Sequence, residues 1–402
     1  MQPGATHPPL LILGVSVRAL AESASLAQIP TLGVDLFADR DAQRSAPIAV
    51  ASTYPNDLFR FAASQPRGPW MYGGSLENFP DEVELLERTH PLAGCSAAAI
   101  RRVRSRQLLR QWAASCQLEL PPANRLTSHQ TWLVKSLHSS GGRGVRWATE
   151  QEQARHETFA ADTGAESADH SSRLEAWVPG NVGAITFVSG LSTSNSPECT
   201  TIGVTWQCPA GRGAAEFAYT GSVGPAQLPK HVQENLEQLG QRITREAALC
   251  GLWGLDFILT PAGQPYVLEV NPRWTGSVEV LERVLRRPLL PDHLRGCGFS
   301  LGGWERPDVA NVPHIHHGKR IVFAERTAEA DLELVEWLDE LHGSAAWPMR
   351  PVADLPSAGQ VFAPGDPVCT VFAHGDDCEQ VLQRLSQLEA AVHARLAPTS
   401  GT

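Results

Sequence analysis

The sequence lacks several features that would assign it to a class at once. Its eight cysteines are scattered and include no Cys-x-x-Cys pair, which argues against a zinc knuckle or a disulfide framework. No apolar run approaches the length that spans a bilayer, so a membrane protein is not expected. The early apolar run 10–17 has no basic flank and no cleavage pattern, which argues against a signal peptide. Reduced thiols in a cytoplasm fit these absences.

Two nucleotide-binding signatures are missing as well. No glycine-rich loop ends in Gly-Lys-Ser/Thr, which excludes a Walker A loop, and no G-x-G-x-x-G follows the first apolar run, so no dinucleotide is assigned. An excess of basic charge is also absent, because the formal net charge is −10. That charge argues against a protein built on contacts with nucleic-acid phosphates. It does not argue against ATP, since phosphate recognition needs only a local positive pocket.

One stretch, 254–277, carries the most informative group of residues. Two apolar runs are separated by a Pro-Ala-Gly-Gln turn, which predicts a β-hairpin. Asp256 opens the first strand, and Glu269 and Asn271 close the second at alternate positions, so their side chains share a face. Two carboxylates and an amide oxygen form a hard-oxygen site that suits Mg²⁺ bound together with substrate phosphates. Arg273 adds a positive fork suited to a phosphate or carboxylate.

A second informative stretch lies upstream. A β-rich run ends in Lys135, and a glycine-rich loop that contains Ser140, Gly141, Gly142 and Gly144 leads into another β-rich segment. Glycines let backbone N–H groups approach phosphates closely, and a lysine supplies a point charge. This predicts a loop that covers phosphates, with an ordinary flexible hairpin as the alternative.

Together these pieces resemble the ATP-grasp superfamily over most of the chain. The resemblance implies that Lys135 and the glycine-rich loop close over ATP, and that the metal site of the hairpin holds Mg²⁺, or Mn²⁺ in its place. It also implies an adenine hinge near 175–180, where Trp177 and Val178 offer backbone groups to the base. The cofactor-binding residues implied for this hinge are Glu175, Ala176, Trp177 and Val178.

The resemblance extends to an arginine and departs from the family at two positions. Many members place a basic residue one helix before the proline-marked loop to contact the ATP phosphates, and Arg106 matches best, with a solvated basic helix face as the alternative. Ala176 stands where the family often has lysine. Val182 stands where it often has a ribose-binding glutamate, which leaves the ribose contacts open.

The predicted fold is α/β with α+β elements. Length and composition, 402 residues with 42% hydrophobic and 19% charged, indicate a globular chain of two to three domains. The β-α-β order of strand 10–15, helix 18–28 and strand 31–37 suggests a Rossmann-like half. We expect a Rossmann-like pre-ATP-grasp domain over 1–100, an ATP-grasp domain over 101–305 and a small C-terminal α+β domain over 306–402.

Four residues are candidate substrate contacts, each with a plainer alternative. Ser16 and Arg18 follow the first strand, where ligands gather in such sheets, although helix capping and a surface charge are equally ordinary roles. Glu77 lies in a glycine turn and is at least as well explained as a solvated acid. Ser277 is expected to cap a helix whose N-terminus favours an anion. In the run 314–317, the histidines are better explained as polar strand residues than as metal ligands.

The expected activity is that of an ATP- and Mg²⁺-dependent, ADP-forming ligase. A carboxylate would be activated as an acyl phosphate and captured by an amine or a similar nucleophile, with Lys135 and Arg273 as the catalytic residues. A bicarbonate-dependent carboxylase acting through carboxyphosphate and a non-catalytic nucleotide-binding protein are the alternatives. The flanking sequences resemble a branch of ATP-dependent carboligases, some linked to pterin-dependent one-carbon metabolism and hence to cofactor biosynthesis. Dimers are common among related enzymes, so a homodimer is compatible.

Overall fold

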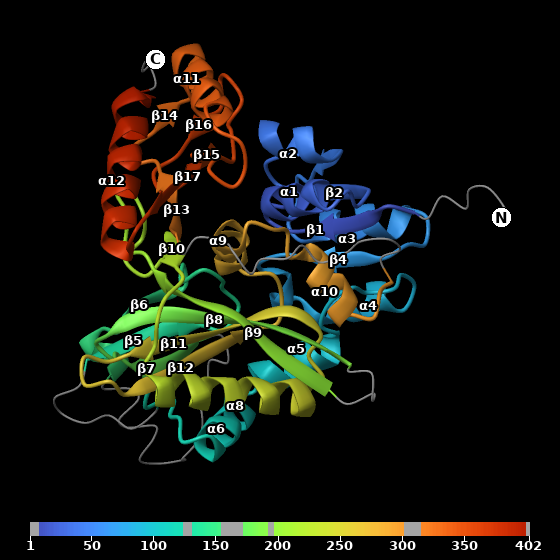
Figure 1. The fold of residues 1–402 in the computed structure, drawn as a ribbon, viewed down its shortest axis with the longest axis vertical. Helices are drawn as coiled ribbons and strands as arrows, with labels where there is room; N and C mark the ends of the chain where they lie inside the picture. Colours follow the sequence, from blue (N-terminus) through green and yellow to red (C-terminus); the bar gives the residue numbers. More distant parts are fainter. Residues whose placement is uncertain (1–7, 124–130, 154–171, 192–196, 301–314, 399–402) are drawn as a thin grey trace.

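The computed structural model describes most of the chain and places the N-terminal third beside a large antiparallel sheet (Figure 1). The part of the chain that it describes comprises residues 8–123, 131–153, 172–191, 197–300 and 315–398.

The N-terminal third forms a parallel sheet with helices against it, which confirms the expected Rossmann-like arrangement. Its strands follow the order β3-β2-β1-β4, and each neighbouring pair is parallel. The apolar run of β1 is buried throughout, as a central parallel strand requires. The elements are β1 (Leu10–Leu13), α1 (Arg18–Leu26), β2 (Thr31–Asp35), α2 (Arg40–Ser45), β3 (Ile48–Val50), α3 (Asn56–Ser64) and β4 (Trp70–Tyr72).

A helical segment leads from this sheet to the next part of the chain. It contains η1 (Leu76–Asn78), α4 (Pro80–Glu87), α5 (Ala97–Arg104) and α6 (Arg106–Ser115). The basic residues of this segment therefore belong to two helices. Ser105 separates them, because its extended backbone ends α5 while its hydroxyl accepts a hydrogen bond from the N–H of Leu108 and caps α6.

A small antiparallel sheet carries the glycine-rich loop. It has the order β6-β5-β7, formed by β5 (Trp132–Ser136), β6 (Val145–Trp147) and β7 (Ser172–Ala176). The loop joins β5 to β6, and β7 leads into the predicted hinge.

An eight-stranded antiparallel sheet forms the centre of the molecule. Its order is β12-β11-β8-β9-β10-β13-β17-β15, so strands from the last quarter of the chain continue the sheet that contains the predicted metal hairpin. Its strands are β8 (Asn181–Leu191), β9 (Pro197–Gln207), β10 (Gly221–Gly224), β11 (Gly251–Leu259), β12 (Pro265–Asn271), β13 (His316–Phe323), β15 (Val352–Ala353) and β17 (Pro367–Gly375).

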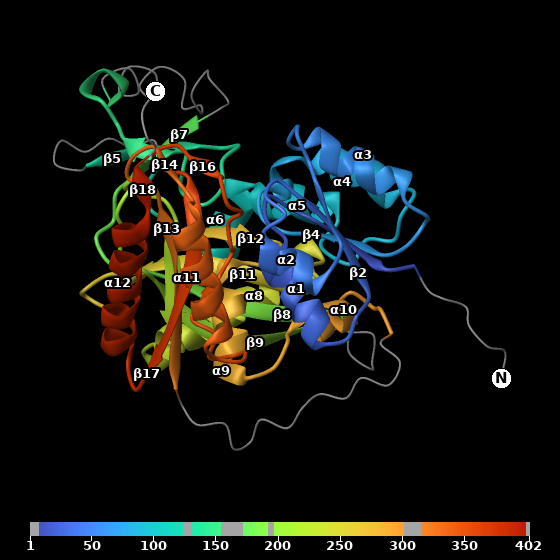
Figure 2. The same cartoon turned by 90° about the horizontal axis from the view of Figure 1, so that it is seen from above.

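Helices cover this sheet on both sides. In Figure 1, α8 (Lys230–Ala247) runs along the strands β8, β9, β11 and β12. Its apolar stripe consists of residues spaced three or four positions apart, and all of them are buried: Val232, Leu236, Leu239, Ile243 and Ala247. Both views place α9 (Gly276–Leu285) between the N-terminal third and the C-terminal strands, and α12 (Cys378–Arg395) along β13 and β17 (Figure 2). The remaining elements are α10 (Leu290–Gly296), α11 (Leu332–Gly343), β14 (Ala328–Glu329), β16 (Val361–Phe362) and β18 (Ala397–Pro398).

Candidate active site

The predicted hairpin exists and has a bulge beside its acidic residues. Asp256 of β11 pairs with Glu269 of β12, and Phe257 pairs with Val267, so Leu268 is the extra residue of a β-bulge. The bulge turns the carbonyl of Leu268 toward Arg106, whose guanidinium donates to it at 2.9 Å.

The three predicted metal ligands lie together near the open end of this hairpin. Asp256 lies within β11, which begins at Gly251, so the prediction that it opens the strand is wrong. The amide Nδ2 of Asn271 donates to Oδ2 of Asp256 at 3.1 Å, and Glu269 lies opposite Asp256 in the strand register. Burial, followed by the negative charge of Glu269, raises the pKa of Asp256 to about 7. A divalent cation between these oxygens would relieve that repulsion, so the donor set fits Mg²⁺.

The amide oxygen of Asn271 matters for this fit. In the described part of the chain, no group of three His, Cys, Asp or Glu side chains has an arrangement that could hold a metal. A site here therefore needs the amide oxygen in addition to the two carboxylates. That oxygen accepts a hydrogen bond from Nη2 of Arg273 at 3.2 Å, and a carbonyl oxygen retains a second lone pair for a cation.

Three cations surround the buried carboxylate of Glu175. Lys135 pairs with Oε1, while Arg106 and Arg173 lie 2.6 and 3.4 Å from Oε2. Burial alone would raise the pKa of Glu175, but the charges of Lys135 and the two arginines hold it below its usual value. The carboxylate thus remains ionised and holds three positive groups beside the hairpin, as a phosphate-binding pocket requires.

The glycine-rich loop is folded tightly against the segment 217–219. The carbonyl of Gly141 accepts a hydrogen bond from the N–H of Tyr219 at 2.8 Å, and Ser136 donates to the carbonyl of Gly144 at 2.8 Å. Gly142 has a φ of 73°, and a Cβ there would lie 1.7 Å from the carbonyl oxygen of Phe217. Two causes therefore exclude a side chain at Gly142: the left-handed backbone conformation and the close contact with the carbonyl oxygen of Phe217.

Glu77 connects the loop to Arg273. Its Oε1 lies 2.8 Å from Nη2 of Arg273 and accepts a hydrogen bond from the hydroxyl of Ser140 at 3.3 Å. The neighbouring Asn78 also donates to Ser140, at 3.0 Å. Glu77 is almost fully buried, so the solvated acid proposed as its alternative is wrong.

In the predicted hinge, the backbone N–H of Trp177 does not have the role expected from the resemblance. The N–H of Trp177 donates to the carbonyl of Thr131 at 2.9 Å and so continues the pairing of β5 with β7. It is therefore not free for a base edge in this conformation, which corrects the expected use of that group. Val178 is half-buried, and Ala176 is buried in the sheet.

Two substrate candidates have structural partners instead of open positions. The buried guanidinium of Arg18 pairs with Glu279 and donates to Asp354 at 2.8 Å, so it joins α1 to α9 and to the C-terminal segment. The alternative prediction, that Arg18 is a charge on the protein surface, is also wrong. Ser277 is not the cap expected for α9, because Thr275 occupies that position and Ser277 lies buried inside the first turn. Ser16 is exposed at the end of β1.

Some functional candidates were missed in the sequence. Arg173 lies two positions before Glu175 on one strand, and this alternate spacing was a usable signal that both face the same pocket. Trp147 and Phe217 pack edge to face with ring centroids 5.1 Å apart, and Trp147 packs in the same way against Trp177 at 5.9 Å. Their sequence separation gave no sign of this aromatic group beside the hinge.

The histidine run has an ordinary explanation where it is described. His314 lies outside the described residues. His316 shares a hydrogen bond with the carbonyl of Asp376, and His317 is buried on β13 with its ring 5.8 Å from that of His374.

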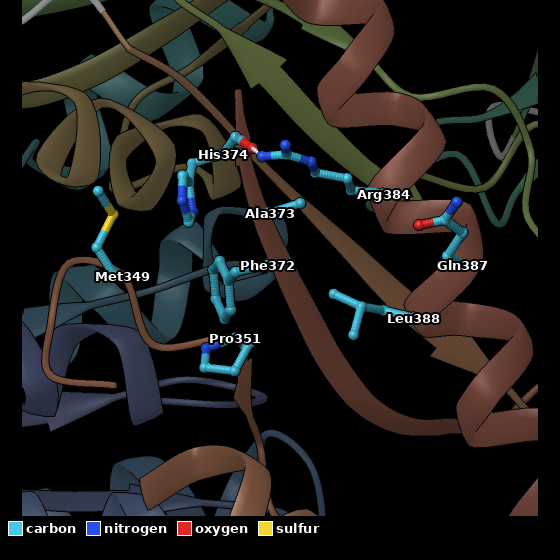
Figure 3. A pocket seen from close by; sticks show the side chains of 8 residues that line it. All are labelled: Met349, Pro351, Phe372, Ala373, His374, Arg384, Gln387 and Leu388. Atoms are coloured by element: carbon cyan, nitrogen blue, oxygen red, sulfur yellow. Dashed lines mark hydrogen bonds between the residues drawn. The ribbon is translucent and has the colours of Figure 1, made fainter. Parts of the chain in front are cut away.

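A separate hollow of about 340 Å³ lies at the C-terminal strands (Figure 3). Phe372 and His374 of β17 line one side, Arg384 of α12 lines another, and Met349 and Pro351 close it. None of the predicted site residues is among those that line it.

Part of the chain matches a known family. A model of the ATP-grasp domain family matches residues 105–277, which include the helix α6, the glycine-rich loop, the predicted hinge and the hairpin of β11 and β12. Over these residues the chain is similar to an ATP-grasp domain.

Solved structures with the ATP-grasp fold align with nearly the whole chain. N5-carboxyaminoimidazole synthetase from Staphylococcus aureus, complexed with ADP, is 14% identical with a TM-score of 0.64, over 95% of this chain and 96% of that one. L-amino acid ligase from Bacillus licheniformis is 12% identical with a TM-score of 0.66, over 96% and 98%. The biotin carboxylase domain dimer of Hydrogenobacter thermophilus 2-oxoglutarate carboxylase, solved with MgADP, ADP and bicarbonate, is 14% identical with a TM-score of 0.64, over 93% and 88%. At such identities the likeness shows the fold alone.

A sequence match to a curated protein is shorter. A stretch of 100 residues is 29% identical to the arginine-specific large chain of carbamoyl phosphate synthase from Bacillus subtilis, and it spans 25% of this chain and 9% of that protein.

Among the described residues, no helix is both long and apolar enough to cross a membrane.

Proposed function

We propose that this protein is an ATP-dependent, ADP-forming ligase that activates a carboxylate as an acyl phosphate and joins it to an amine or a similar nucleophile. The observation that carries the proposal is a continuous set of contacts around one site. On one side, Ser140 contacts Glu77, which pairs with Arg273, which in turn contacts Asn271 of the metal group. On the other side, Arg106 joins the carbonyl of Leu268 in the bulge to Glu175, which pairs with Lys135.

Each part of this site suits one task. Asp256, Glu269 and Asn271 would hold Mg²⁺, or Mn²⁺ in its place, which when bound neutralises charge on the triphosphate. Lys135, with Arg106 and Arg173 held around Glu175, would face the phosphates, and the glycine-rich loop would cover them. Arg273 would steady the phosphoryl group in transfer, and its pairing with Glu77 fixes the direction of its guanidinium.

The reaction needs no nucleophile from the protein. A substrate carboxylate oxygen attacks the γ-phosphorus, the bond to the bridging oxygen breaks, and ADP leaves. An amine then attacks the acyl carbon of the mixed anhydride, and inorganic phosphate leaves as the amide forms. The task of the side chains is to hold the reactants and to balance charge, which is what buried pairs such as Glu77–Arg273 can do.

A second candidate is a carboxylase that activates bicarbonate as carboxyphosphate. Two of the structural neighbours favour it, since one is N5-carboxyaminoimidazole synthetase and another is a biotin carboxylase domain solved with bicarbonate. ADP release from the purified protein, measured against pooled carboxylates and amines and then with bicarbonate, distinguishes the two. Release that requires a carboxylate and an amine supports the ligase, and release that requires bicarbonate supports the carboxylase. Tight ATP binding without ADP release in any mixture would contradict both and would indicate a nucleotide-binding protein without turnover.

The proposal has a cellular part that rests on the resemblance to the carboligase branch. We place the reaction in the cytoplasm, in cofactor biosynthesis connected with one-carbon metabolism. We also propose a homodimer, because one neighbour of the same fold was solved as a dimer. Light scattering of the purified chain tests the assembly, and a mass of one chain would contradict it.

A further inference from the structure

The hollow of about 340 Å³ at the C-terminal strands opens where one strand leaves its neighbour. β15 pairs with β17 only through Val352 and Ala353, and one further hydrogen bond joins the N–H of Phe372 to the carbonyl of Pro351 at 2.7 Å. Before Pro351 the chain departs from β17. The hollow lies in the space that this departure leaves, between Met349 and the strand (Figure 3).

A buried arginine of α9 holds the departing chain in place. Nη1 of Arg283 donates to the carbonyl of Pro348 at 2.7 Å and to that of Arg350 at 2.9 Å, so these carbonyls do not pair with β17. The same guanidinium lies 3.5 Å from the ring centroid of Phe372, which lines the hollow. Because Arg283 contacts both walls, the hollow is a preformed feature of the fold, as ligand sites usually are.

Most of the wall is apolar. Phe372 and Pro351 lie on one side, and Leu388 of α12 faces them across the hollow (Figure 3). Met349 adds a flexible apolar side chain. A ligand that fills this space therefore needs an apolar body to cover these side chains.

The polar part of the lining carries positive charge. Arg384 of α12 donates to the carbonyl of His374, which holds its guanidinium at the rim, and Gln387 follows one turn later (Figure 3). In the described part of the chain Arg384 makes no ion pair. None of the described residues that line the hollow is acidic. Since a guanidinium has five N–H donors, Arg384 retains donors for a carboxylate.

More positive charge lies behind the wall. Arg283 is fully buried, forms no ion pair with a described residue, and leaves Nε and Nη2 without a hydrogen-bond partner. Burial, followed by the charges of Arg384 and Arg286, lowers the pKa of His374. The arginines around this histidine thus act in the same direction, and an anion in the hollow would offset their charge.

We propose that this hollow binds a small organic anion, namely a carboxylate or a similar oxyanion carried on an apolar ring or branched alkyl group. The anionic group would accept hydrogen bonds from Arg384, and the apolar body would pack against Phe372 and Leu388. An inorganic anion would leave the apolar wall uncovered, and a cation would be repelled. The inference does not depend on the proposed function, because none of the predicted site residues lines the hollow and binding requires no ATP.

The test is a fluorine NMR titration of the full-length protein, without ATP, with para-fluorobenzoate and with the uncharged para-fluorobenzyl alcohol. We expect the benzoate to bind at least about tenfold more tightly than the alcohol, and Arg384→Gln to remove about this difference, because it removes a charge-assisted hydrogen bond. Leu388→Ala should weaken both probes by about threefold. The matched control is Arg395→Gln, which removes the same charge from the same helix where it packs over Trp337, and it should change neither.

A second control separates this hollow from the candidate active site, which would also bind a carboxylate if the proposed function is correct. Arg273→Gln should leave the Arg384-dependent binding unchanged. Benzoate binding that is lost in Arg273→Gln and kept in Arg384→Gln would overturn the inference. So would the absence of benzoate binding, equal affinity for the two probes, or equal weakening by Arg395→Gln. Because Arg384 is exposed, its variant should fold, and circular dichroism checks this.

Discussion

Glu77 and Arg273 come from distant parts of the sequence and form a buried ion pair with a closest N–O distance of 2.8 Å. Burial alone would raise the pKa of Glu77, but the charge of Arg273 keeps it below its usual value, so the carboxylate stays ionised. Because the same carboxylate oxygen contacts Ser140, the pair connects the glycine-rich loop to the metal hairpin.

Glu77→Gln should lower kcat/KM for ADP release by roughly 10- to 100-fold, because Arg273 loses the charge that fixes its direction. The matched control is Asp81→Asn, which removes an acid paired with the exposed Arg101 on a nearby helix. Steady-state ADP release measures both. An unchanged kcat/KM in a folded Glu77→Gln protein would remove the positioning role.

Glu269→Gln should reduce ADP release by at least about 100-fold while leaving the fold intact, because it removes one charged ligand from the proposed metal group. Its side chain is exposed, so stability should change little. Glu234→Gln, at an exposed position on α8, is the control. Turnover like that of the unaltered protein would refute the metal assignment.

Glu175→Gln should lower the free energy of unfolding by about 2 to 3 kcal/mol, because Lys135, Arg106 and Arg173 would then repel one another without their shared anion. Saturating ATP should restore part of this loss, since phosphates would replace the missing charge. Urea unfolding with and without ATP measures both effects. No dependence on ATP would argue against a phosphate pocket at Glu175.

Arg18→Ala should destabilise the protein by about 3 kcal/mol, because the buried Glu279 keeps Lys319 but loses the guanidinium, and the carboxylate of Asp354 loses its ion pair with Arg18. At a temperature where the variant is folded, its KM for ATP should not change. Denaturant unfolding and ADP release test the two statements. A rise in the KM of a carboxylate or amine substrate without loss of stability would restore Arg18 as a substrate contact.

Glu282 should make stability fall as the pH rises. Burial raises the pKa of this carboxyl to about 8, although Ser23 and the N–H of Leu289 both donate to it. Between pH 4.5 and about 8, the carboxyl of Glu282 is therefore protonated in the folded state and ionised in the unfolded chain. The free energy of unfolding falls over this range, and the contribution of the protonated carboxyl is lost as the pH rises through about 8. Glu282→Gln, which imitates the neutral form, should have a thermal midpoint roughly 2 to 4 °C above the unaltered protein at pH 9. Equal midpoints at pH 9 would contradict this.

Local patterns predicted much of the architecture. The stripe of α8 follows from apolar spacing, and the hairpin of β11 and β12 follows from two apolar runs with a turn between them. These features depend on residues close in sequence. The bulge at Leu268 was not predictable in this way, because it requires knowledge of which residues pair across the hairpin.

Charged residues were the least predictable. From the sequence, Arg18 and Glu77 could each lie in the substrate cleft or on the surface. In the structure both are buried in ion pairs with residues far away in the sequence, Arg18 with Glu279 and Glu77 with Arg273. Such pairing depends on the packing of separate segments, which one sequence does not reveal. Arg173 is the exception, because its alternate spacing with Glu175 was visible in the sequence.

The eight-stranded sheet has a practical consequence for anyone who shortens this chain. Because β10 hydrogen-bonds to β13, a version that stopped before His316 would leave a row of unpaired N–H and C=O groups along β10. An open edge of this kind recruits strands from other molecules, so the truncated protein should precipitate instead of behaving as a minimal catalyst.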